Sequence, residues 1–176
     1  MRAVTAEGFT EMKVHRLVLD PNTNSPIVIL QSEATGQMLP IWIGIFEAHA
    51  IAMKMEGIES PRPMTHDLLG NTIAALQGMV ERVEVVDLVD NTYFARVYVK
   101  LRDERFAVDS RPSDAIALAL RAPSPIFVAN HVLEQSKIEP TPELEEARAE
   151  GDAQEEEDEW TRILKNFNPS GREKIN

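Results

Sequence analysis

The first part of the chain alternates between short apolar runs and clusters of turn-forming residues. Three runs rich in Val, Ile and Leu cover residues 13–19, 26–31 and 37–43, and this composition is typical of β-strands. The segments between them contain Pro, Asn, Ser, Thr and Gly, which favour turns. We therefore predict a three-stranded antiparallel meander.

Helical patterns follow the meander. Residues 45–57 have helical composition and end at Gly57, a residue suited to a helix C-terminus. Residues 65–80 place apolar side chains at helical spacing, with Thr65 as the expected N-cap and Asp67 in the first turn. We predict two helices here, joined by a proline-containing loop.

Strand-like alternation returns after the second helix. Residues 82–90 and 92–101 alternate clearly and are joined at Asp90 and Asn91, which favours a β-hairpin. The remaining predicted elements are a strand at 105–109, a helix at 112–121, a strand at 126–130 and a short helix at 131–137.

These elements predict an α+β fold: a single compact domain at residues 12–138, in which a mostly antiparallel sheet packs with about four helices. A short extension at 1–11 precedes it. Residues 139–176 form a tail with 12 acidic and 5 basic residues, a net charge of −7, which is typical of disordered or marginally helical segments.

Composition narrows the class of protein. The chain of 176 residues has no cysteine, which excludes disulfides and thiolate metal sites. It contains no apolar run near the roughly 18 residues of a membrane helix, and its first residues lack the apolar core of a signal peptide. We expect a soluble, cytoplasmic protein with no membrane partner. The net charge of −11 argues against tight nonspecific binding of nucleic acid.

A first candidate site is the segment "PRPMTHD", residues 61–67. The N-terminus of a helix presents free N–H groups and a partial positive charge, so Arg62 and His66 would make it a seat for phosphate. The alternative is purely structural: Thr65 caps the helix, Asp67 complements the dipole and His66 is solvated.

A second candidate is the entry of the helix in "DSRPSDAIALALR". A carboxylate in the first turn gains roughly 0.3–1 kcal/mol from the helix dipole, which would explain Asp114 but not the additional Asp109, Arg111 and Ser113. Two carboxylates beside an arginine are suited to a divalent ion and a phosphate. A structural pair between Arg111 and an aspartate is the alternative.

A third candidate is Glu47, a charged residue in the otherwise largely apolar helix of residues 45–57. An acidic side chain with apolar neighbours on both sides suggests a functional role. A solvated helix edge would explain it equally well.

Several stretches together resemble the bifunctional nuclease domain family. They are "LPIWIGIFEAHAIA", "PRPMTHDLL", "YFARVYV", "DSRPSDAIALALR" and "PIFVANHVLE", in the family's order and spacing over about residues 12–138. The resemblance implies a compact α+β domain that often self-associates and that degrades DNA and RNA. The family's signature polar residues fall on Glu47, Arg62, Thr65, His66, Asp67, Asp109, Arg111, Ser113 and Asp114.

The resulting hypothesis is a metal-assisted nuclease acting on DNA and RNA. Divalent ions, Mg²⁺ or Mn²⁺, would activate water. His66 would act as general base or acid, and Arg62 and Arg111 would bind phosphate oxygens, assisted by Thr65 and Ser113. The expected metal ligands are Glu47, Asp67, Asp109 and Asp114. These four residues and His66 form the expected catalytic set.

Two other hypotheses remain open. One is a non-enzymatic regulatory module that binds an anion or a protein, which the acidic composition and the few aromatic stacking positions favour. The other is a homo-oligomer in which the apolar meander forms the interface and the polar cluster shapes a groove between subunits.

Overall fold

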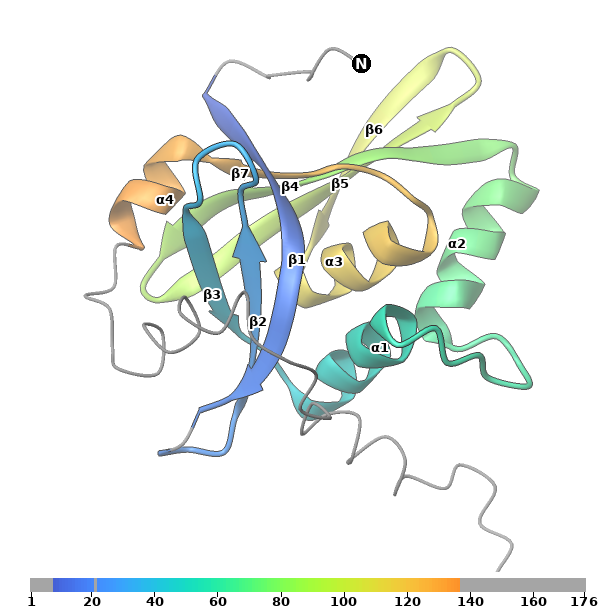
Figure 1. Cartoon of the computed structure of the whole chain (residues 1–176). Coiled ribbons are helices and arrows are strands. Elements are labelled where there is room, and N and C mark those ends of the chain that lie inside the picture. The colour runs from blue at the N-terminus through green and yellow to red at the C-terminus, as the bar shows by residue number, and fades with distance from the viewer. Residues whose placement is uncertain (1–7, 21, 137–176) are drawn as a thin grey trace, which may run out of the picture. The chain divides into compact units, whose positions relative to one another are not determined.

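The computed structural model describes residues 8–20 and 22–136. The predicted acidic tail at 139–176 lies outside the described residues. Figure 1 shows the elements in chain order. They are β1 (Phe9–Leu19), β2 (Pro26–Gln31), β3 (Met38–Trp42), α1 (Ile45–Met55), α2 (Thr65–Ala75), β4 (Gly78–Val89), β5 (Thr92–Leu101), β6 (Glu104–Ser110), α3 (Pro112–Arg121), β7 (Ile126–Ala129) and α4 (Asn130–Gln135).

The strands form a seven-stranded sheet in the order β3-β2-β1-β7-β4-β5-β6. All neighbouring pairs are antiparallel except β4 and β7, which run parallel. The predicted α+β class, the meander β1–β2–β3 and the hairpin β4–β5 are confirmed. Asp90 and Asn91 both have positive φ, 48° and 59°, as the two central residues of a tight hairpin turn require.

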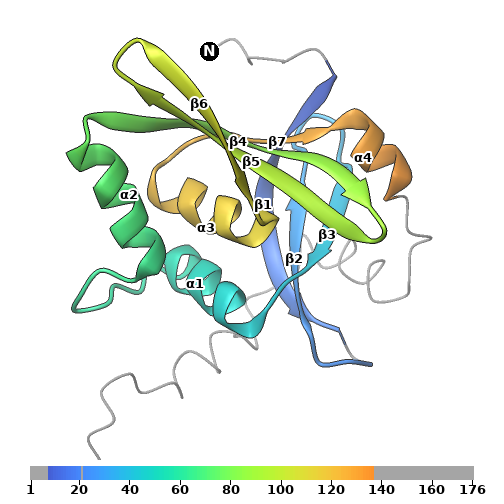
Figure 2. The ribbon, with the colours of Figure 1, turned by 180° about the vertical axis from the view of Figure 1, so that it is seen from behind.

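Helix α3 lies at the centre of the helical layer. It packs against β4 and β5 of the sheet and lies beside the helices α1 and α2, an arrangement visible from both sides in Figures 1 and 2. Its residues 115–119 are all buried. The helix packs against α1, whose buried face includes Ile51. Since α3 is enclosed on several sides, its N-terminus is held in a fixed position relative to α1 and α2.

The largest differences from the predicted boundaries lie at the start of β1 and at the junction of α2 and β4. Strand β1 begins at Phe9, inside the predicted extension of residues 1–11, because residues 9–12 pair with β7. Helix α2 ends at Ala75 rather than near residue 80, because Gln77 adopts a positive φ of 62° and Gly78 starts β4. A Cβ at Gly78 would lie 3.1 Å from the backbone oxygen of Ile73, so this close approach favours glycine.

The helix termini follow the predicted chemistry in part. Gly57, with φ of 65°, follows the end of α1, and Pro112 is the first residue of α3, both as predicted. Thr65 is not the N-cap of α2, because Met64 occupies that position and its N–H is bound by the Asp67 carboxylate instead. Among the described residues, none of the helices combines the length and apolar character needed to cross a bilayer.

Candidate functional site

Arg111 and Asp114 form a local ion pair at the start of α3. Arg111 is the N-cap residue with extended backbone angles, and Asp114 lies in the first turn. Two guanidinium nitrogens bind the two carboxylate oxygens: Nε donates to Oδ2 at 2.7 Å and Nη2 to Oδ1 at 3.1 Å. This two-point geometry fixes the planes of both groups. The Arg111 side chain is nevertheless 65% exposed.

His66 binds the same carboxylate from a different helix. It lies in the first turn of α2 and is buried, and its Nε2 is 3.1 Å from Oδ1 of Asp114. Burial alone would raise the pKa of Asp114, but the hydrogen bonds from Arg111 and His66 outweigh it and hold that pKa below its ordinary value. The carboxylate is therefore ionised at neutral pH and accepts a hydrogen bond.

The tautomer of His66 follows from this contact. Because an ionised carboxylate has no proton to donate, Nε2 of His66 must carry the hydrogen. In the neutral imidazole, Nδ1 then has the free lone pair, and within the described part of the chain it has no hydrogen-bond partner. Nδ1 is thus the ring atom suited to accept a proton.

Glu47 extends the chain of contacts to a third helix. Its Oε1 lies 2.8 Å from Nη2 of Arg111, and its side chain is only 17% exposed. The hydrogen bond with Asp114, followed by that with Glu47, raises the pKa of Arg111 above its ordinary value. Glu47, Arg111, Asp114 and His66, here called the His66 cluster, therefore connect the first turns of α1, α2 and α3.

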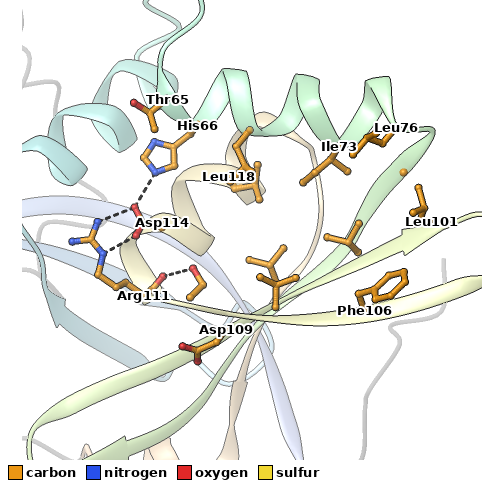
Figure 3. Close-up of a pocket in the computed structure, with 16 residues that line it drawn as sticks. Thr65, His66, Ile73, Leu76, Leu101, Phe106, Asp109, Arg111, Asp114 and Leu118 are labelled. Atoms are coloured by element: carbon orange, nitrogen blue, oxygen red, sulfur yellow. Dashed lines mark hydrogen bonds and ion pairs between the residues drawn. The ribbon is translucent and has the colours of Figure 1, made fainter.

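A cavity of about 770 Å³ opens beside the cluster, between α2, α3 and the strands β5 and β6. Figure 3 shows His66, Arg111 and Asp114 at one end and apolar side chains along the rest. The apolar lining includes Leu69, Ile73, Val97, Val99, Phe106 and Leu118. A ligand that fits here needs a polar or charged end for the cluster and an apolar or flat portion for the remainder.

Two predicted carboxylates do not join the cluster. Asp67 turns away toward Arg121, whose Nε donates to Oδ1 at 2.7 Å. Asp109 borders the cavity, but it alternates with Val108 and Ser110 on β6, so its side chain points to the other face of the strand, as Figure 3 shows. On that face Asp109 lies opposite Arg96 of β5 in the strand register.

The remaining predicted residues surround the cluster without contacting it through a hydrogen bond between side chains. Thr65 is exposed and lines the cavity. Arg62 is exposed in the loop before α2 and has no ion pair within the described residues. Ser113 is buried, 6% exposed, as the second residue of α3.

The predicted metal ligands are therefore dispersed. Glu47 and Asp114 both bind Arg111, Asp67 binds Arg121, and Asp109 faces away. In the described ranges, no three His, Asp or Glu side chains lie where they could jointly hold a metal ion. The side chains, as placed, do not fit the predicted Mg²⁺ or Mn²⁺ site, because a guanidinium occupies the position between the two nearest carboxylates.

Arg121 is a residue of this region that sequence reasoning missed. It is 7% exposed and ties three helices together, with Nη1 on the Ala117 oxygen at 3.0 Å and Nη2 on the Ala50 oxygen at 2.9 Å, besides Asp67. A basic residue in the last turn of a helix is a usual complement to the dipole, so its sequence position gave no sign of burial.

The model of the bifunctional nuclease domain matches residues 28–141. This range includes every member of the His66 cluster and all the strands and helices around the cavity. The chain belongs to the bifunctional nuclease domain family.

The chain is similar to mycobacterial and plant proteins. An uncharacterized protein of Mycobacterium tuberculosis strain H37Rv is 35% identical over 159 residues, which cover 90% of this chain and 95% of that protein. Bifunctional nuclease 2 of Arabidopsis thaliana is 30% identical over 112 residues, 62% of this chain and 34% of the plant protein. Bifunctional nuclease 1 of Oryza sativa subsp. japonica is 24% identical over 129 residues, 70% and 39% respectively. The matches thus span about a third of each plant protein.

Proposed function

We propose that this protein is a phosphodiesterase that cleaves DNA and RNA, with the His66 cluster as its active site. The observation that carries the proposal is the pairing of a buried imidazole, oriented by Asp114, with an exposed arginine side chain at the mouth of a cavity. The similarity to proteins named bifunctional nucleases supports the choice of substrate.

His66 is the proposed general base. Its Nδ1 takes a proton from water, and the resulting hydroxide forms a new bond to phosphorus while the ester P–O bond breaks. The leaving oxygen takes a proton from solvent. Asp114 acts through His66 by fixing the tautomer and ring plane, so it is a positioning residue.

Arg111 is the proposed phosphate-binding group. Its two carboxylate contacts hold the guanidinium in place, and the exposed side chain remains available to a phosphate oxygen. Arg62, exposed just upstream of α2, would bind the next phosphate along the strand. Thr65 at the cavity wall would hydrogen-bond the bound substrate, whereas buried Ser113 would act only through the backbone of α3.

The predicted requirement for Mg²⁺ or Mn²⁺ stays a prediction. Because the carboxylates do not gather around one point, no step of the proposed reaction passes through a metal. The cysteine-free composition remains the basis for proposing a cytoplasmic location.

The test is cleavage of labelled single-stranded DNA and RNA by the purified full chain, with Mg²⁺, Mn²⁺ or EDTA. His66→Gln and Asp114→Asn should lose activity. The matched control is His131→Gln, because His131 is exposed on α4 and pairs with Asp87. Equal activity in all three variants would indicate contaminating nuclease and contradict the proposal. Full activity in EDTA would contradict only the predicted requirement for Mg²⁺ or Mn²⁺.

A second candidate function is a non-enzymatic module that binds an anionic or protein ligand. It is favoured by the apolar lining of the cavity and by the neutralisation of Arg111 by two carboxylates. Saturable binding of an oligonucleotide that depends on Arg111, without any cleavage, would favour this function over the nuclease.

A further inference from the structure

The two edges of the sheet differ in how they are protected. The edge strand β3 carries Pro40 and is buried along its middle, which blocks the addition of another strand. The other edge strand, β6, has no proline, and its residues 104–109 are all exposed. Phe106 is 44% and Val108 50% exposed. Within the described residues no strand covers the outer edge of β6, so its backbone groups there have no strand partner.

The sequence of β6 is complementary to itself. In an antiparallel pair of two copies centred on Ala107, Arg105 lies opposite Asp109, Phe106 opposite Val108, and Glu104 opposite Ser110. All seven residues are then paired. From this complementarity we propose that β6 is the interface between two copies of this chain, which join their sheets across a two-fold axis at Ala107.

In this register the side chains on each face of the joined strands meet suitable partners in the other copy. Phe106 and Val108 face the cavity, so each would cover the other's exposed surface across the axis. On the opposite face, Asp109 would gain a cation. Asp109 has no ion pair within the described residues. Arg105 binds Glu81 of β4 through Nε, so its guanidinium would turn from Glu81 to reach Asp109 of the second copy.

Other registers lose these matches. A two-fold axis at Arg105 would place two guanidinium groups opposite each other, which is destabilising. Axes at Phe106 or Val108 would pair only five of the seven residues and would leave Arg105 and Asp109 without opposite charges. A symmetric pair needs the same patch on both copies, and the register at Ala107 alone satisfies shape and charge together.

The pairing has a consequence for the candidate site. A two-fold axis perpendicular to the sheet keeps both cavities on the same face of the joined sheet. The second copy would extend each cavity along the row of Phe106 and Val108. The inference rests on strand geometry and charge and does not rest on the proposed nuclease function.

Cross-linking tests the register directly, because the chain has no native cysteine. In Ala107→Cys the two new thiols would face each other with Cα atoms about 4.5–5.5 Å apart, within the range that a disulfide spans. Mild oxidation should convert most of the full-length protein to a covalent dimer. Val108→Cys is the matched control, since its own copy lies on the diagonal at about 7–8 Å.

A second cross-linking experiment uses two variants at the positions on either side of Ala107. Phe106→Cys and Val108→Cys, each poorly cross-linked alone, should cross-link when mixed, because residue 106 faces residue 108 of the other copy. A monomer in sedimentation at all concentrations, or a dimer that cross-links at none of these positions, would overturn the proposal.

Placing like charges at the two-fold axis tests whether the two copies associate through β6. Ala107→Lys places two lysines opposite each other on an exposed position, so the dissociation constant should rise several-fold, while Ala107→Ser should leave it unchanged. Circular dichroism shows whether each variant is folded. Loss of association with retained cleavage would separate the interface from the active site; equal dissociation constants for both variants would contradict the interface.

Discussion

His66 and Asp114 are 48 positions apart in the sequence, and the Nε2 of His66 lies 3.1 Å from Oδ1 of Asp114. Each residue belongs to the first turn of its helix, so the contact brings the N-termini of α2 and α3 together. An ionised carboxylate at this point fixes the imidazole tautomer and leaves Nδ1 as the basic nitrogen. The value of this arrangement for catalysis depends on the carboxylate, which makes Asp114 the most informative position to alter.

Asp114→Asn should lower the rate constant of cleavage by about 10²- to 10⁴-fold, the usual contribution of general acid–base catalysis. The amide keeps the shape but can donate to Nε2, which would shift the ring proton to Nδ1. The measurement is the pH dependence of kcat/KM, whose profile should change shape in Asp114→Asn. A uniform fall with an unchanged profile would mean that Asp114 only supports the fold.

Arg111→Lys tests the bridge between two carboxylates. A single ammonium cannot reproduce the two-point contact with Asp114 and also reach Glu47. We expect KM for an oligonucleotide to rise about tenfold or more, because phosphate binding is lost. The free energy of unfolding should change by less than about 1 kcal/mol, since the Arg111 side chain is largely exposed. Glu47→Gln, which keeps the pair of Arg111 and Asp114, is the control and should raise KM less.

Ile73→Trp tests whether the cavity receives substrate. Ile73 lines the cavity from α2, so a larger side chain would fill space that a bound molecule needs. KM should rise several-fold with little change in the melting temperature. Ala74→Trp places the same bulk on the exposed side of α2 and should leave KM unchanged. Identical KM values for the two variants would mean that the substrate lies outside the cavity.

Much of the fold could be predicted because its signals are local. Alternation revealed β4 and β5, and Asp90 and Asn91 marked their turn. The end of α2 was missed because Gln77 takes the left-handed conformation that glycine usually supplies, while apolar residues 79 and 80 fit a helix or a strand. The placement of β7 between β1 and β4 depends on contacts between distant segments, which no local pattern encodes.

The sequence predicted which residues lie near the site better than it predicted which of them contact each other. Asp67 follows His66 directly, yet one residue is about 100° around a helix, so the two side chains face different neighbours. Asp109 is close to Arg111 in sequence, but alternation along β6 turns it to the other face. The contact of Glu47 with Arg111 arises only when α1 packs beside α3.

Asp67→Ala should lower stability rather than catalysis. It would leave the buried guanidinium of Arg121 without its carboxylate, at a cost of about 3 kcal/mol. Urea unfolding measures this loss. Replacing both partners, with Asp67→Leu and Arg121→Met, should recover much of the stability, because an unpaired buried charge is then absent. Normal stability with lost cleavage in Asp67→Ala would instead place Asp67 in the active site.

The pH dependence of stability tests the ionised state of Asp114. Its pKa in the folded protein lies below the ordinary value of 3.8, so its contribution to the free energy of unfolding is complete above that value. As pH falls below 3.8 and through the folded pKa, the carboxylate takes up a proton and the contribution disappears. The difference in unfolding free energy between wild type and Asp114→Asn should therefore be constant between about pH 5 and pH 7. It should shrink below about pH 4. Glu59→Gln, at an exposed loop position, should show little difference at any pH. A difference between wild type and Asp114→Asn that grows on acidification would contradict an ionised Asp114 held by Arg111 and His66.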